Sequence, residues 1–74
     1  MSDKLDLHGT RHNEARRILE NFIYQHIQRG TNEVEIITGN SPEMKKIVSD
    51  IAKEYDMTTR ECWGNFGCLI LNMT

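Results

Sequence analysis

The order of hydrophobic and polar positions predicts a chain of alternating strands and helices. Along residues 4–8, two leucines alternate with Asp6 and His8, which is the period-two pattern of a short strand that ends at Gly9 and Thr10. Because side chains on a strand alternate between its two faces, Asp6 and His8 should share the face opposite the leucines.

A helix is predicted next, because the apolar period lengthens between residues 11 and 29. We expect Thr10 to cap its N-terminus and Gly30 to end it, with His26 at the boundary of the core. The apolar stripe of this helix consists of Ala15, Ile18, Leu19, Phe22, Ile23 and Ile27.

The middle of the chain predicts a second strand over residues 33–38 and a second helix. Ser41 is placed to cap this helix, with Pro42 at its first position, and the helix should run to about Tyr55. Its apolar stripe consists of Met44, Ile47, Val48, Ile51, Ala52 and Tyr55.

The last part of the chain reads as a β-hairpin, with strands over residues 57–63 and 68–73 and a turn at 64–67. The closing strand begins with a nearly continuous apolar run, which suits a central position, so we place it between the second and third strands and antiparallel to both. The order β-α-β-α-β-β, with right-handed crossovers, predicts an α/β two-layer sandwich. It would have a four-stranded mixed sheet with both helices on one face, as a single domain over residues 1–74.

Composition narrows the possible functions only a little. A net charge of −2 gives no overall attraction to nucleic acid or to an anionic membrane, so any polyanion site must come from a local cluster. The sequence shows neither an apolar stretch of about 18 residues nor the apolar core of a signal peptide, and we therefore expect a cytoplasmic protein.

Two cysteines, Cys62 and Cys68, flank the turn of the predicted hairpin. They could form a disulfide, but nothing else in the sequence indicates secretion. We interpret them as two buried thiols in a reducing compartment. Without a neighbouring histidine, the pair is not expected to form a zinc site.

Candidate chemistry gathers where the first two strands end. Parallel strands joined by right-handed crossovers end at the same edge of a sheet, where helix N-termini also open and ligands commonly bind. The first strand leads into Gly9, and the second leads into Thr38, Gly39 and Asn40. Gly39 would let a phosphate approach the backbone, although a plain turn is the simpler reading. The sequence has neither a Walker A motif nor G-x-G-x-x-G, so we expect no nucleotide cofactor.

Asp6 and His8 are the catalytic candidates on this edge. A carboxylate can orient or charge-stabilise an imidazole, and an imidazole can move protons near neutral pH, which fits hydrolysis of a phosphodiester. The spacing alone is a weak signal, because such triplets occur often by chance and Asp6 could equally hold the turn or cap the helix. His12 could join the same edge.

Basic residues could add phosphate contacts there. The early turns of the two helices carry Arg11, Arg16, Arg17, Lys45 and Lys46, whereas acidic residues such as Glu54 lie at the far end. As a group we interpret these cations as a basic edge. The alternative is that each lies on a solvated helix face in pairs such as Arg16–Glu20.

The stretch Leu5-Asp6-Leu7-His8-Gly9 resembles the signature that opens Smr domains, and the helix after it, with Glu14-Ala15, fits the same pattern. Thr38-Gly39 resembles the start of the family's second signature, which is threonine or histidine, glycine, any residue, glycine. The resemblance continues through the second helix and the closing hairpin.

This resemblance implies the β-α-β-α-β-β sandwich and an endonuclease that acts on RNA, including messenger RNA on stalled ribosomes, or that nicks DNA. It implies Asp6 and His8 as catalytic residues, with Gly39 and Asn40 shaping the binding loop. The chain departs from the family pattern at Ser41, which stands where the second glycine would be. Family members are often attached to larger proteins, so this chain is either naturally minimal or a fragment.

Three functions follow in order of preference. The first is a metal-independent endoribonuclease that uses no cofactor, with Asp6 and His8 as catalytic residues and nucleic-acid contacts from Gly9, Arg11, His12, Thr38, Gly39, Asn40, Lys45 and Lys46. The second is a non-catalytic module that binds RNA or DNA on the same edge. The third is a protein-interaction domain that uses the hairpin, with Trp63 and Phe66 exposed.

Overall fold

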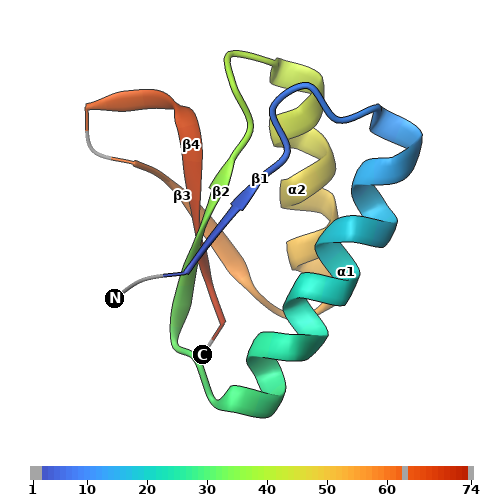
Figure 1. The fold of residues 1–74 in the computed structure, drawn as a ribbon. Coiled ribbons are helices and arrows are strands. Elements are labelled where there is room, and N and C mark those ends of the chain that lie inside the picture. Colours follow the sequence, from blue (N-terminus) through green and yellow to red (C-terminus); the bar gives the residue numbers. More distant parts are fainter. Residues whose placement is uncertain (1–2, 63, 74) are drawn as a thin grey trace.

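The structure is a computed structural model that describes residues 3–62 and 64–73 (Figure 1). The predicted order of elements is confirmed as β1 (Lys4–Asp6), α1 (His12–Arg29), β2 (Glu33–Ile37), α2 (Pro42–Glu54), β3 (Thr58–Cys62) and β4 (Asn65–Asn72).

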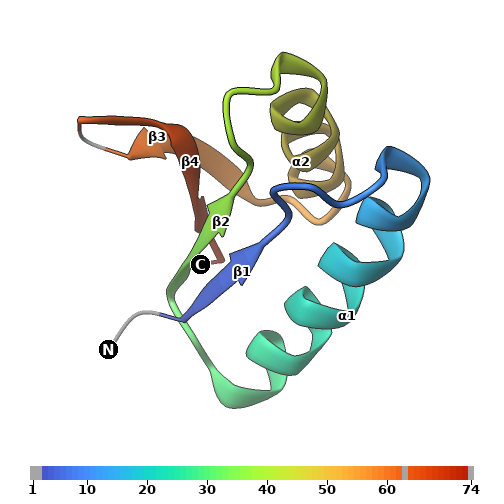
Figure 2. The same ribbon diagram turned by 45° about the horizontal axis from the view of Figure 1, so that its top comes forward.

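The four strands form one mixed sheet in the order β1-β2-β4-β3. β1 pairs in parallel with β2, and β4 pairs antiparallel with both β2 and β3, as the apolar run of the closing strand predicted. Both helices cover the same face of this sheet (Figures 1 and 2). The α/β two-layer sandwich expected from the sequence is therefore confirmed, and no helix within residues 3–62 and 64–73 covers the opposite face of the sheet.

The core lies between the sheet and the two helices. On the first helix the buried positions are Ala15, Leu19, Ile23 and His26. Ile27, which the predicted stripe included, is 49% exposed, whereas His26 is only 3% exposed. The 3.6-residue period brings position 26 rather than 27 onto the face that begins at Ala15. His26 is accommodated there because its ring packs on Phe22 and its Nδ1 lies 3.0 Å from the Thr31 hydroxyl.

The two helix starts differ in how closely they follow the prediction. The Ser41 hydroxyl accepts the backbone N–H of Met44 at 3.1 Å, so the predicted cap of α2 is confirmed. Thr10 does not cap α1, because its own N–H closes a turn onto the carbonyl of Leu7 and the cap position falls on Arg11. The turn after β1 thus delays the start of the helix.

The closing hairpin is tighter than expected. β4 begins at Asn65, three residues before the predicted start, because the turn is confined to residues around Gly64, which has a φ of 72°. A register shift lies between Glu61 and Cys62 on the partner strand.

Cys62 and Cys68 form a disulfide across this hairpin, which corrects the interpretation of two free thiols. Their Cα atoms are 5.5 Å apart, within the range that a disulfide spans. The rarity of disulfides in reducing compartments carries no information on how close two side chains lie across a hairpin. Across the described residues, no helix has the length and apolarity needed to cross a membrane.

Candidate nucleic-acid site

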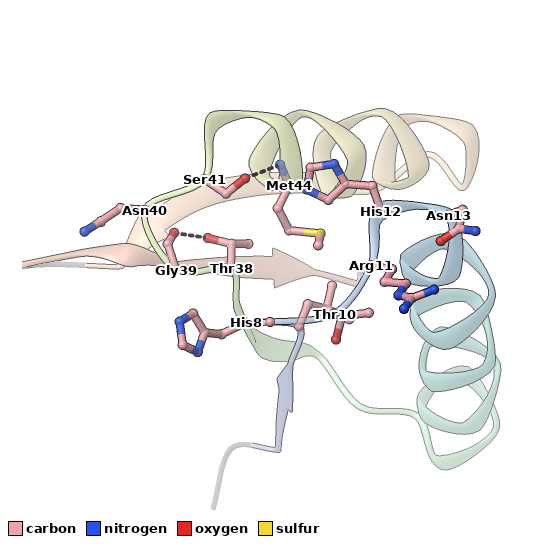
Figure 3. Close-up of a pocket in the computed structure, with 12 residues that line it drawn as sticks. His8, Thr10, Arg11, His12, Asn13, Thr38, Gly39, Asn40, Ser41 and Met44 are labelled. Atoms are coloured by element: carbon pink, nitrogen blue, oxygen red, sulfur yellow. Dashed lines mark hydrogen bonds between the residues drawn. The ribbon is translucent and has the colours of Figure 1, made fainter.

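A hollow of about 820 Å³ lies where β1 and β2 end (Figure 3). Residues 7–13 and 38–41 line it, together with Met44. Both helices begin beside it, so the positive ends of two helix dipoles point toward the same space. The edge chosen from topology is therefore the site of the hollow, and it suits an anionic ligand.

Asp6 ends β1, and His8 follows in the turn that leads from this strand into the hollow. The Asp6 carboxylate accepts a hydrogen bond from the backbone N–H of His8 at 2.8 Å. This contact fixes the main chain of the turn, as the alternative reading of Asp6 anticipated, and His8 is presented on the surface as an exposed side chain. Asp6 therefore contacts His8 through its backbone N–H.

The loop after β2 forms the opposite wall. Thr38 is 2% exposed, and its hydroxyl donates to the carbonyl of Gly39 at 2.9 Å (Figure 3). The backbone N–H groups of Thr38 and Gly39 both donate to the carbonyl of Gly67 on β4, at 2.9 and 3.0 Å. This loop is thus held from two sides, by its own side chain and by the neighbouring strand.

The His8 ring packs directly against Gly39. A Cβ atom at position 39 would lie 2.8 Å from the Cδ2 atom of His8, and Gly39 has a φ of 67°. The backbone conformation therefore favours glycine here, and any larger residue would displace the His8 ring. Gly39 thereby makes room for the imidazole, and its expected role in letting a phosphate approach the backbone stays a prediction.

His12 lies at the rim of the same hollow, at the first position of α1. Its Nδ1 is 3.1 Å from a carboxylate oxygen of Glu43, in the first turn of α2. The pair bridges the two helix starts, although both side chains are substantially exposed, and the ionic component holds only when His12 is protonated.

The predicted binding residues divide into two groups. Gly9, Arg11, His12, Thr38, Gly39 and Asn40 line the hollow beside His8. Lys45 and Lys46 line a second hollow between α2 and β3, together with Lys53 and Arg60. The two lysines point away from the first hollow because residues 44 and 45 are adjacent on a helix and face about 100° apart.

The basic edge proposed from the sequence is not formed as one cluster. Arg16 donates to Glu54 at 2.8 Å and lies 3.4 Å from Glu20, and Arg17 lies 2.7 Å from Glu14. The hydrogen bond from Arg16 lowers the pKa of the Glu54 carboxyl. The alternative reading of solvated helix faces with local pairs is correct for these two arginines, because the helices cross and bring Arg16 to the acidic end of α2.

Two features of the site escaped sequence reasoning. The Gly67 carbonyl holds the loop at residues 38 and 39, but its strand lies far away in sequence and a backbone acceptor leaves no residue signal. Ser41 was recognised only as a helix cap, and it also lines the hollow. Trp63 and the side chain of Phe66, expected to be exposed on the hairpin, lie outside the described residues.

Comparison with known proteins gives one finding. The sequence model of the Smr domain family matches residues 5–73, which is nearly the whole chain. No curated protein and no solved structure is similar enough to match. The matched span includes both walls of the hollow and the hairpin that supports one of them.

Proposed function

Because the chain belongs to the Smr domain family, a nuclease-like family that binds nucleic acid, we propose that it is an endonuclease that cleaves RNA beside His8. The observation that carries this proposal is the position of the imidazole. It lies on Gly39, in the wall of a hollow onto which two helix N-termini open. The substrate class implies a cytoplasmic protein that meets RNA, including RNA on ribosomes. DNA nicking is the alternative reaction.

The proposed reaction uses the nucleophile that RNA already carries. His8 takes the proton from a 2′-hydroxyl, whose oxygen forms a bond to the adjacent phosphorus. The bond to the 5′-oxygen breaks, and this oxygen is protonated from solvent. The products carry a 2′,3′-cyclic phosphate and a 5′-hydroxyl. Negative charge that develops on the phosphate oxygens would face the helix N-termini and Arg11.

Asp6 would contribute in two ways. Its hydrogen bond to the His8 backbone fixes the turn and hence the direction of the imidazole. Its negative charge, two residues away, would also stabilise the imidazolium that forms when His8 accepts a proton. A metal has no step to perform in this route, so EDTA should change the rate little.

The test of this route is a substrate with 2′-deoxyribose at the cleaved position. We expect cleavage to stop, because the nucleophile is removed while the phosphate and the bases remain. Product analysis of the all-ribose substrate should show the 2′,3′-cyclic phosphate. Equal cleavage of the deoxy substrate, or strong inhibition of the disulfide-bonded chain by EDTA, would mean that an activated water or a metal performs the chemistry.

A non-catalytic binding module is the second candidate, and one observation favours it. Ser41 replaces the second glycine of the family's loop signature, and its hydroxyl is committed to capping α2. The site is then more rigid and less open to a phosphate than a glycine loop would be. If wild-type protein binds RNA and cleaves neither RNA nor DNA, this candidate holds.

The lysines on the far side of α2 give a prediction about affinity. Changing Lys45→Ala and Lys46→Ala together should weaken RNA binding for all sequences and reduce the salt slope by roughly one contact per charge removed. The cleavage rate at saturating RNA should stay the same, because neither residue lines the hollow beside His8. Fluorescence anisotropy at several salt concentrations measures the slope.

Arg29→Ala is the matched control, since Arg29 is an exposed cation in the last turn of α1, at the other end of the helix from the hollow. Its loss should leave both affinity and salt slope nearly unchanged. If the lysine variant binds like the arginine variant, these lysines do not contact the substrate.

A further inference from the structure

The face of the sheet that carries no helix holds a group of metal-ligating side chains away from the hollow. Glu35 on β2, Cys68 on β4 and Cys62 on β3 come from three neighbouring strands. One carboxylate oxygen and the two sulfur atoms all lie within 4.8 Å of one another. Cys68 is buried, and the other two are half-buried.

We propose that Cys62, Cys68 and Glu35 hold one zinc ion when the Cys62–Cys68 disulfide is reduced. Zinc prefers thiolate and carboxylate donors in a tetrahedral arrangement, and three protein ligands with one water is a common form of its site. The sequence lacked a third ligand beside the cysteines. The antiparallel pairings of β4 with β2 and with β3 supply it, because they bring Glu35 beside the hairpin.

Dimensions of the group agree with such a site. With Zn–S bonds of about 2.3 Å and tetrahedral angles, the two sulfurs would lie roughly 3.8 Å apart. The separation of bonded sulfurs is about 2.0 Å, so reduction must let them part by roughly 2 Å. Rotation of the side chains can supply this movement without a shift of the strands. The Glu35 carboxylate oxygen lies within 4.8 Å of both sulfurs, close enough for its side chain to complete the site by a small rotation.

The two forms of the site interconvert by balanced chemistry. A cellular dithiol reductant transfers two electrons and two protons, which breaks the sulfur–sulfur bond, gives two thiols and leaves the reductant as a disulfide. Zinc then displaces the two thiol protons and binds the thiolates. In the cytoplasm, which the proposed RNA substrate implies, thiols are kept reduced, so the metal-binding form would predominate there.

The cationic side chains near Glu35 and Cys62 oppose the binding of a zinc ion only weakly. Lys4 lies 3.5 Å from a Glu35 carboxylate oxygen, but its side chain is 60% exposed and can turn to solvent. Arg60, on the same strand as Cys62, is occupied with Glu33 at 3.4 Å. Exposed pairs of this kind contribute little energy, so Glu35 can exchange its lysine partner for a metal.

The experiment titrates Co²⁺, a spectroscopic substitute for zinc, into the full chain reduced by a phosphine. We expect a sulfur-to-cobalt charge-transfer band that saturates at one ion per chain and disappears when Zn²⁺ is added. The oxidised chain should show no band. Absence of the band from the reduced wild type, or its presence in the oxidised protein, would overturn the proposal.

Glu35→Gln tests the third ligand while keeping both cysteines. Loss of a direct ligand should weaken zinc affinity by more than about 10-fold, since even outer contacts cost 10–100-fold. Glu33→Gln, on the same strand and face, is the matched control and should bind like wild type. Equal affinity of Glu35→Gln and wild type would remove Glu35 from the site. Circular dichroism confirms that each variant folds, and the metal readout is independent of nuclease activity.

Discussion

Replacing His8 by alanine should lower the rate of RNA cleavage by about 10²–10⁴-fold, the usual contribution of a positioned proton-transfer group. The fold should survive, because His8 is exposed and its loss opens no cavity in the core. RNA affinity should change little, since most of the hollow's lining remains. Single-turnover cleavage at saturating RNA measures the rate, and thermal unfolding checks the fold.

Asp6→Asn is the companion variant. The amide oxygen of asparagine can accept the same hydrogen bond from the His8 backbone, so the turn should persist while the negative charge is lost. A small loss of rate in this variant would assign Asp6 a positioning role, and a large loss would assign it an electrostatic one. If His8→Ala cleaves as fast as wild type, the imidazole does not move the proton.

Substituting Gly39 by alanine should abolish most cleavage and also destabilise the fold. An added Cβ would lie 2.8 Å from the His8 ring, so the imidazole must move away from its place in the hollow. The left-handed backbone conformation, with φ of 67°, adds a cost of roughly 1–2 kcal/mol for a non-glycine residue. Cleavage kinetics and urea unfolding together measure the two effects.

The Gly30→Ala variant separates these effects. Gly30 has a similar φ of 72°, and a Cβ there would meet nothing within 4 Å, so this variant carries the backbone cost alone. It should lose stability but retain cleavage. In a His8→Ala background, Gly39→Ala should cost about as much stability as Gly30→Ala, because the ring contact is gone. If the losses of unfolding free energy from the two single substitutions simply add in the double variant, His8 and Gly39 do not interact.

The architecture could be predicted from the sequence because helices and strands are marked by local, periodic patterns of apolar residues and by residues typical of helix starts. The apolar run from Cys68 to Leu71 was enough to place the last strand inside the sheet, and Pro42 after Ser41 was enough to place a helix start. The family motifs likewise located the hollow, since each motif lies where a strand gives way to a helix.

The remaining features could not be predicted, because they depend on contacts between residues far apart in the sequence. Arg16 was expected among phosphate contacts, but the crossing of the helices brings it to Glu54, 38 residues away. Lys45 and Lys46 lie on the expected helix but face the second hollow and not the one beside His8, because their direction depends on the rotation of the helix about its axis. The disulfide and the proximity of Glu35 depend on strand register, which no single segment encodes.

The two hydrogen bonds to the carbonyl of Gly67 couple the stability of one wall of the hollow to the stability of the hairpin. Any fluctuation that lifts β4 at this point releases the amides of Thr38 and Gly39 together, and the support beneath the His8 ring is lost with them. Proteins open in cooperative units rather than one contact at a time. The loop at Thr38 and Gly39 and the closing hairpin should therefore form one such unit, so that changes on the hairpin alter the fraction of time in which the His8 ring is supported.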